Sequence, residues 1–342
     1  MSSWITRLSL ISLMFAFCVI LLGAYTRLAD AGLGCPDWPG CYGQLSAPSS
    51  VTEIMDANRS FPFLTVNTSK ARTEMTHRYF AETLGMFIVV FSLLAFFNRQ
   101  RLTLPMWLPA TLVALVIFQG LLGMWTVTFK LLPLAVLSHL IGGFCTLGLL
   151  WLAWLYLSYR PLPALKLSPN LALLSKITLG VLAVQIILGG WTSANYAALI
   201  CPDFPMCQGQ WWPAFNLYAL NFFSGVGSET PLALMDFSAR TSIHIMHRVG
   251  AICTLILGAY LAFNLWQQAK SLKESAAKQR FQRFSVILAL LLAIQAALGI
   301  SNIVFLLPLP IAVAHNGIAA LLLLTLIALN FTFAHTPRRL YV

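Results

Sequence analysis

Histidine is the residue type whose placement in this 342-residue sequence most clearly predicts chemistry. Four of the six histidines stand close to the beginning of a long apolar segment; they are His77, His139, His247 and His315. A polar ring is costly to bury in a membrane, so a functional role is the default there. Two imidazoles that face each other across a helix bundle commonly hold a haem iron from both sides. The histidines therefore predict two such iron sites, one in each half of the chain.

Two other interpretations of these histidines stay open. Each could make an isolated hydrogen bond between helices, although the matching positions in the two halves disfavour this. Zinc is the weaker alternative, because two histidines per half supply fewer than the four ligands that zinc takes. His335, at the end of the last apolar segment, is expected to be structural.

The two halves differ three residues before the first histidine of each pair. Glu74 precedes His77, whereas His244 precedes His247. An i, i+3 spacing places both members of a pair on one face of a helix. A carboxylate beside one iron site only could move protons or orient a reacting group, which makes Glu74 a candidate catalytic residue. The alternative is an interfacial acid near a helix N-terminus, where negative charge is favoured. Glu82 is a second candidate for proton handling.

An arginine directly follows the first histidine of each pair. Arg78 follows His77, and Arg248 follows His247. Guanidinium groups pair strongly with carboxylates, so both arginines are candidates to bind haem propionates. The alternative is an arginine at the end of a span whose charged group reaches the membrane surface.

Two cysteine pairs share the spacing Cys-x5-Cys: Cys35 with Cys41, and Cys201 with Cys207. The prolines and glycine inside the first loop allow the tight turn that a small disulfide ring needs. A structural disulfide and a redox-active dithiol are both consistent with this pattern. Metal capture by one pair is a weaker possibility.

The composition predicts an all-α integral membrane protein with eight transmembrane helices. Hydrophobic residues make up 59% of the chain, charged residues only 9%, and the mean hydropathy is +0.80. These values exclude a soluble enzyme and a disordered chain, and the uncharged runs are too long for a membrane β-barrel. The expected spans are about 10–28, 76–97, 106–127, 134–157, 174–194, 241–263, 284–305 and 311–333.

The charges predict the orientation. Thirteen of the 21 basic residues, but only one of the ten acidic residues, fall at the termini and in the loops after the second, fourth and sixth spans. The positive-inside rule then places both termini in the cytoplasm and the loops 29–75 and 195–240 outside, in the periplasm of a bacterium. The net charge of +11 is thus a topology signal, and we expect no nucleic-acid partner. No transit peptide is evident, which favours a bacterial inner-membrane protein.

The two halves repeat each other. Residues 35–44 match residues 201–210 at seven of ten positions, and the His-Arg pair recurs. Each unit has four spans, so both copies have the same orientation, and we expect two tandem four-helix bundles, 1–160 and 161–342. Gln119, Gln185 and Gln295 each precede a glycine by four residues, a spacing that suggests helix packing and interhelical hydrogen bonds.

Taken together, these features resemble the haem A synthase family over nearly the whole chain. The resemblance rests on the eight spans in two halves and the outward Cys-x5-Cys loops. It also rests on Glu74-Met-Thr-His77-Arg78, Leu-Ser-His139-Leu, His247-Arg248 and His315-Asn316. It implies that a methyl group of haem O is oxidised to the formyl group of haem A, for use in cytochrome oxidase. The resemblance further implies two successive hydroxylations, which would give a geminal diol that loses water.

The resemblance also implies roles for single residues. His247 and His315 would hold a resident haem b in the C-terminal bundle, and His77 and His139 would flank the haem O substrate in the N-terminal bundle. Glu74 would supply the acidic group near that substrate. Some family members have one cysteine pair or none, so we do not expect a strict catalytic requirement for the second pair here. A haem O synthase and an electron-transfer protein are possible partners.

Two alternatives from other classes carry their own expectations. A membrane electron carrier with two bis-histidine haem b groups would fit the four histidines equally well, but it would give Glu74 no role. A transporter would place paired broken helices near the membrane midplane. The polar groups here gather near the outer face, which makes the transporter the least favoured interpretation.

Overall fold

The computed structural model describes residues 2–223, 226 and 235–337, and within them it is helical with two isolated β-bridges in loops. Eight helices are long and apolar enough to cross a membrane, as the sequence predicts. They are α1 (Ser2–Leu28), α3 (Thr68–Phe97), α4 (Trp107–Thr128), α5 (Pro133–Ser158), α6 (Pro169–Ala194), α7 (Phe237–Ser271), α8 (Ser275–Val304) and α9 (Leu309–His335). The shorter elements are α2 (Val51–Ser60) and the 3-10 turns Arg99–Arg101 and Leu217–Leu220. The chain is a multi-pass membrane protein.

Several helices extend beyond the predicted apolar segments. Helix α3 begins at Thr68, eight residues before the expected start, because the Asn67 side chain accepts a hydrogen bond from the backbone N–H of Lys70 at 3.1 Å. Helix α7 begins after Asp236, whose carboxylate accepts from the N–H of Ala239 at 2.8 Å. Polar caps of this kind decide where a helix starts, whereas hydropathy reports only the part that lies in lipid.

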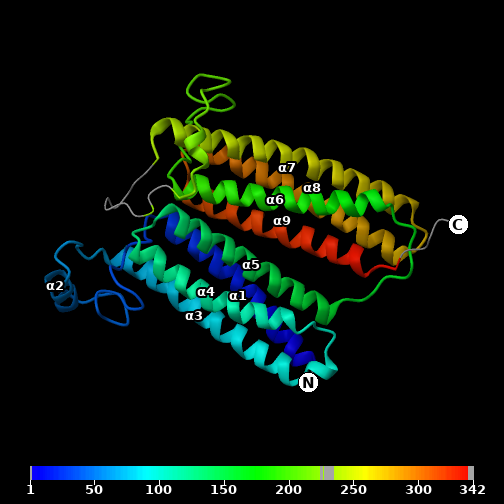
Figure 1. Ribbon diagram of the computed structural model, residues 1–342, viewed down its shortest axis with the longest axis horizontal. Helices are drawn as coiled ribbons and strands as arrows, with labels where there is room; N and C mark the ends of the chain where they lie inside the picture. The colour runs from blue at the N-terminus through cyan, green and yellow to red at the C-terminus, as the bar shows by residue number, and fades with distance from the viewer. Residues whose placement is uncertain (1, 224–225, 227–234, 338–342) are drawn as a thin grey trace.

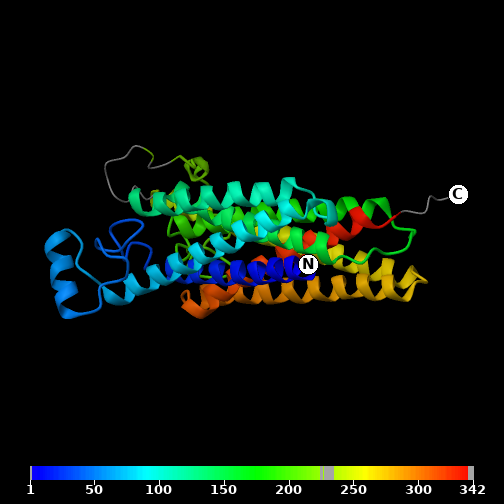
Figure 2. The same cartoon turned by 90° about the horizontal axis from the view of Figure 1, so that it is seen from below.

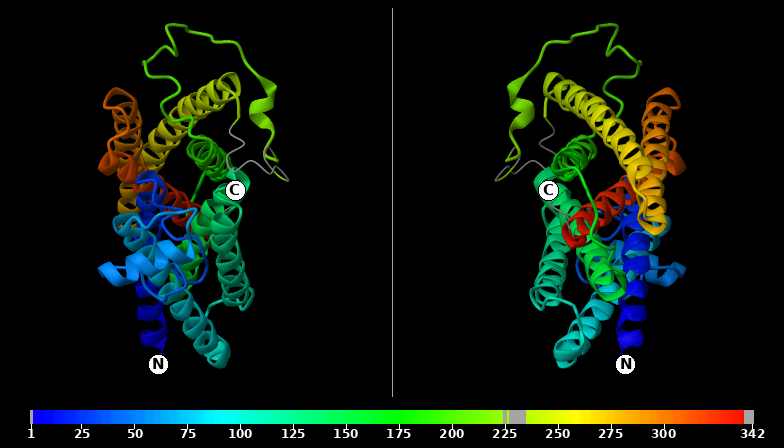
Figure 3. Two further views of the ribbon diagram at one scale, coloured as in Figure 1. Left: turned by 90° about the vertical axis from the view of Figure 1, so that its left-hand side faces the viewer. Right: turned by 90° about the vertical axis from the view of Figure 1, so that its right-hand side faces the viewer.

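The helices contact one another in two sets. In the first set α1 packs on α3, α3 on α4, α4 on α5 and α5 back on α1. The second set repeats this order with α6, α7, α8 and α9. Helices α5 and α9 join the sets, and α1 also packs on α9 (Figures 1 and 3). The division into two four-helix bundles, 1–160 and 161–342, and the separate functions of the two units remain predictions.

The two cysteine loops and α2 lie at one end of the helices, as Figures 1 and 2 show. Helix α1 begins and α9 ends at the opposite end. Placing that end in the cytoplasm remains a prediction from the basic residues. Two of those residues, Arg338 and Arg339, lie outside the described residues.

Candidate functional site

The four predicted iron ligands occupy matching positions in the two helix sets. His77 is the tenth residue of α3 and His247 the eleventh of α7. His139 and His315 are each the seventh residue of their helices, α5 and α9. The structure brings His77 and His139 together with their ring centroids 6.4 Å apart, and His247 and His315 lie close enough to interact electrostatically. The pairing expected from the repeat is therefore present in the fold.

Each of these histidines lies against a glycine of a neighbouring helix. The pairs are His77 with Gly23, His139 with Gly123, His247 with Gly189 and His315 with Gly299. A Cβ added at Gly23 would stand 2.9 Å from the Cε1 atom of His77, and one at Gly189 would stand 3.0 Å from that of His247. The first distance is shorter than a Cβ contact allows and the second is tighter than most, so a side chain at either position would press on the ring. The four notches place the imidazoles between helices.

The donor set fits a haem iron held by two histidines. Metal–imidazole bonds are about 2 Å long, so one metal ion fits between two rings at the separation of His77 and His139. The Nδ1 atoms of His77, His139 and His315 are buried without a hydrogen-bond partner among the described residues. Among the described residues, no group of three or more histidine, cysteine or acidic side chains lies close enough together to hold a metal ion.

Glutamine side chains contact three of the histidines, so the interhelical hydrogen bonds expected of them are present, with histidines as partners that the sequence did not indicate. Gln185 Nε2 lies 3.0 Å from the Nδ1 atom of His247, and Gln295 Nε2 lies 3.2 Å from the Nε2 atom of His315. Gln119 differs, because it donates to the backbone carbonyl of His139 at 3.2 Å. The sequence feature that could have indicated these contacts is a glutamine four residues before the glycine that faces a histidine, which occurs in α4, α6 and α8.

Glu74 is buried and joins α3 to the first cysteine loop. Its carboxylate accepts a hydrogen bond from the backbone N–H of Cys35 at 2.9 Å and forms an ion pair with Arg78. The Arg78 guanidinium also donates to the carbonyls of Asp37 and Gly40, at 3.0 and 2.6 Å. The predicted contact of Arg78 with propionates stays a prediction. In the described structure, this arginine holds the loop and the acid together.

The second half anchors its loop with different groups. Arg248 donates to the carbonyls of Asp203 and Met206 at 2.8 and 2.7 Å, which matches Arg78. His244 stands where Glu74 stands in the first half, and its Nδ1–H donates to the carbonyl of Ala197 at 2.8 Å. His244 is therefore a loop anchor, a role that the sequence did not indicate. The predicted contact of Arg248 with propionates also stays a prediction.

The two cysteine loops have the same fold. Disulfides join Cys35 to Cys41 and Cys201 to Cys207, with Cα atoms 4.8 and 4.6 Å apart. In the second loop the Asp203 carboxylate accepts from the backbone N–H groups of Gln208 and Gly209. These bonds, that of Gly209 foremost, lower the pKa of Asp203. Asp37 makes the equivalent contacts in the first loop, so the sequence repeat is a structural repeat.

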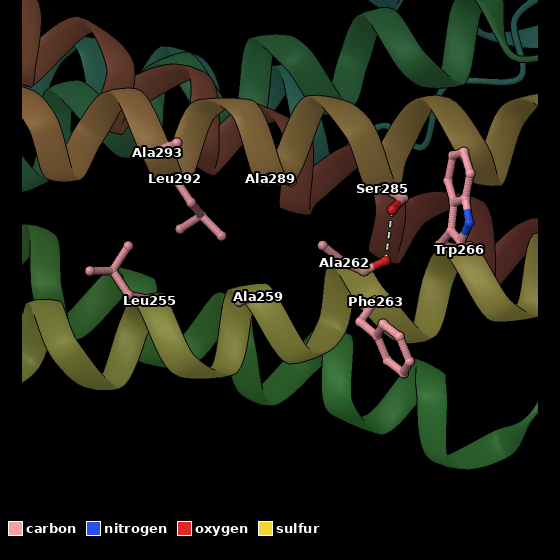
Figure 4. A pocket seen from close by; sticks show the side chains of 9 residues that line it. All are labelled: Leu255, Ala259, Ala262, Phe263, Trp266, Ser285, Ala289, Leu292 and Ala293. Atoms are coloured by element: carbon pink, nitrogen blue, oxygen red, sulfur yellow. Dashed lines mark hydrogen bonds between the residues drawn. The ribbon is translucent and has the colours of Figure 1, made fainter.

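Other polar and hollow features lie apart from this site. Glu82 is exposed on α3, outside the buried network of Glu74. An apolar groove of about 490 Å³ lies between α7 and α8 (Figure 4). Its lining begins at Leu255, two helical turns beyond His247, and its main polar contact is the Ser285 hydroxyl that donates to the Ala262 carbonyl at 2.7 Å. It is not part of the histidine site.

The model of the COX15-CtaA family, described as cytochrome oxidase assembly protein, matches residues 6–327. The chain belongs to this family. It is 45% identical to the heme A synthase of Shewanella oneidensis over 97% of both chains. It is 28% identical to the heme A synthase of Maricaulis maris, over 92% of this chain and 91% of that one. The heme A synthase of Rhizobium meliloti is also 28% identical, over 95% of this chain and 87% of its own length.

Proposed function

We propose that this chain is a haem A synthase, an oxidoreductase that converts a methyl group of haem O to the formyl group of haem A. The observation that carries the proposal is the near-complete match to a heme A synthase at 45% identity. The paired histidines support it, because a haem substrate and a haem cofactor each need iron ligands. The di-haem electron carrier would leave the buried acid of one half unexplained.

We assign the C-terminal pair, His247 and His315, to a resident haem b and the N-terminal pair, His77 and His139, to the haem O substrate. The buried carboxylate of Glu74, which has no counterpart among the described residues of the C-terminal half, supports this division. Haem b supplies a one-electron redox centre when bound. The remaining steps depend on residues of the N-terminal half, which hold the substrate iron and handle protons.

Glu74 is suited to move a proton at Oε2. This oxygen accepts the Cys35 N–H, while Oε1 faces Arg78, so the carboxylate is oriented from both sides. Loss of water from a geminal diol requires one proton to leave a hydroxyl group and another to reach the departing oxygen. A positioned carboxylate can perform both transfers. Arg78 and the disulfide loop keep Glu74 in place on the helix face that carries His77.

We further propose a bacterial inner-membrane location with both termini in the cytoplasm and the cysteine loops in the periplasm. The excess of basic residues at one end supports it, and an oxidising periplasm is consistent with two disulfides. In this setting the substrate comes from a haem O synthase in the same membrane, and an electron-transfer protein is the further partner.

The test is production of haem A by cells that make haem O and lack a haem A synthase of their own. Expression of this chain should give haem A, identified by mass after extraction. The Glu74→Gln variant should leave haem O unconverted while the protein level stays the same. If cells with normal levels of the wild-type protein contain no haem A, the proposed function is wrong.

A further inference from the structure

The C-terminal half holds one of its histidine rings with a side chain that the N-terminal half lacks. Gln185 on α6 places its Nε2 atom 3.0 Å from Nδ1 and 3.0 Å from the backbone oxygen of His247. The amide fits because residue 250 on α7 is glycine. A Cβ at Gly250 would lie only 2.2 Å from Oε1 of Gln185. The contact therefore needs both the glutamine and the glycine.

The repeat shows what stands at the same places in the N-terminal half. Val19 precedes Gly23 by four residues, as Gln185 precedes Gly189. Phe80 follows His77 by three residues, as Gly250 follows His247, and it stacks on Phe15 with ring centroids 5.1 Å apart. Both parts of the contact are thus replaced together by apolar residues.

The histidine rings differ accordingly. The Nδ1 atom of His77 is buried and has no hydrogen-bond partner among the described residues, whereas that of His247 faces an amide. A hydrogen bond to the second nitrogen of a ligating imidazole fixes the orientation of the ring and raises its basicity as a ligand. A ring without that bond is oriented only by packing.

We propose that Gln185 is a positioning residue that fixes His247 as an iron ligand, so that the C-terminal half retains its haem while the N-terminal half can exchange one. The inference rests on the proposed function, in which one half keeps a cofactor and the other admits a substrate and releases a product. Retention and exchange require ligands that are held with different strength. Gln185 with Gly250, against Val19 with Phe80, supplies that difference.

The tautomer of His247 decides which atom of the amide faces the ring. Without metal, the amide N–H donates to Nδ1 and the imidazole proton sits on Nε2. When Nε2 binds iron, Nδ1 carries the proton and needs an acceptor. A half-turn of the amide would bring Oε1, a buried atom with no other partner among the described residues, to Nδ1–H in exchange for the present bond from Nε2 to the His247 carbonyl. Amide rotamers interchange these two atoms without moving the rest of the side chain.

The test compares Gln185→Leu with Gln119→Leu. Each of the two glutamine side chains packs against a glycine of the helix that carries its histidine. Gln119, however, contacts only the backbone of that histidine, His139. Purified proteins would be mixed with an excess of a haem-scavenging apoprotein, and the loss of haem b would be followed by its absorption spectrum. Gln185→Leu should retain haem b about 10–100-fold less well than the wild type, as expected for loss of an outer-shell partner. Gln119→Leu should retain it normally.

A redox titration of haem b separates positioning from loss of fold. Gln185→Leu should raise the midpoint potential, because a less basic ligand stabilises ferric iron less. Gln185→Glu keeps an acceptor for Nδ1–H and adds charge, so it should restore retention and lower the potential below that of the wild type. A packing defect is not expected to shift the midpoint potential upward in Gln185→Leu and downward in Gln185→Glu. The proposal would be overturned if these two variants, like Gln119→Leu, kept the wild-type potential and retained haem b as the wild type does. A wild-type protein that retains haem b but makes no haem A would overturn only the proposed function.

Discussion

The two halves of this protein share a framework and differ at a few buried positions. Each half has four long helices, a disulfide loop held by an arginine and two histidines in glycine notches. The N-terminal half adds Glu74 and, among the described residues, leaves His77 without a partner on Nδ1, whereas the C-terminal half has His244 and Gln185. What repeats is suited to hold iron. What differs supports the proposed division into a site for chemistry and a site for retention.

The loop anchors show how small such a difference can be. Glu74 accepts a hydrogen bond from the N–H of Cys35, and His244 donates one to the carbonyl of Ala197. Both attach a loop to the helix below it, so either group would serve for stability. Glu74 is the anchor that lies on the helix face of the first histidine pair, where the proposed function requires a proton-transfer group. The difference therefore points to a role for Glu74 beyond anchoring.

The largest expected effects come from removing one histidine in each half. His247→Ala should lose the resident haem b, because one axial ligand is gone, and haem A formation should fall to background. His77→Ala should also abolish haem A formation but keep haem b. Haem extraction with mass identification would measure both. His335→Ala is the matched control, since His335 packs on Phe331 away from both sites, and it should change neither result. If His247→Ala and His77→Ala lost haem b equally, the proposed difference between the two halves would be wrong.

Replacing Glu74 should affect catalysis without affecting retention. Glu74→Gln removes the proton-transfer group, and we expect haem A formation to fall by about 10²–10⁴-fold. The haem b content should stay at the wild-type level, measured by absorption per chain. The corresponding change in the other half, His244→Gln, should leave haem A formation within a few-fold of normal. If Glu74→Gln and His244→Gln formed haem A at similar rates, Glu74 would have no role beyond anchoring the loop.

The arginine anchors should differ in stability. Arg78→Leu leaves the buried carboxylate of Glu74 without its cation, which typically costs about 3–5 kcal/mol. Arg248→Leu removes hydrogen bonds to carbonyls but leaves no buried charge unpaired, so about 1–3 kcal/mol is expected. Denaturant unfolding in detergent would compare them. The double variant Glu74→Gln with Arg78→Leu should recover part of the loss, and a loss for Arg248→Leu as large as that for Arg78→Leu would contradict the account.

The two disulfides should contribute alike to stability and differently to activity. Each closes a ring of the same length, which favours the folded loop by about 2 kcal/mol. Replacing Cys201 and Cys207 by serine should lower stability alone. Replacing Cys35 and Cys41 should also slow haem A formation several-fold, because the Cys35 N–H orients Glu74. Thermal unfolding and haem A formation would be measured on both variants, and equal activities would rule out this coupling.

The eight helices were predicted from hydropathy, and the facing histidines from the repeat. Both patterns, the length of an apolar run and the matched spacing of two halves, can be read from a single sequence. Helix ends such as Thr68 were missed because a polar cap, Asn67, extends the helix beyond the apolar run. Gln185 was expected to make an interhelical hydrogen bond, but its partner, His247, was not predicted, for another reason. This contact depends on how two helices are rotated against each other, which spacing along one helix does not determine. The arginine contacts with loop carbonyls depend in the same way on how the loop folds back.

The most direct test of the central claim is to identify the haems bound to the purified wild-type protein and to its two histidine variants. Protein from cells that make haem O should contain haem b together with haem O or a product of its oxidation. His77→Ala should keep haem b alone, and His247→Ala should lose it. Two haem b groups per chain in the wild type, one lost from each variant, would contradict the division into a retaining half and a reacting half.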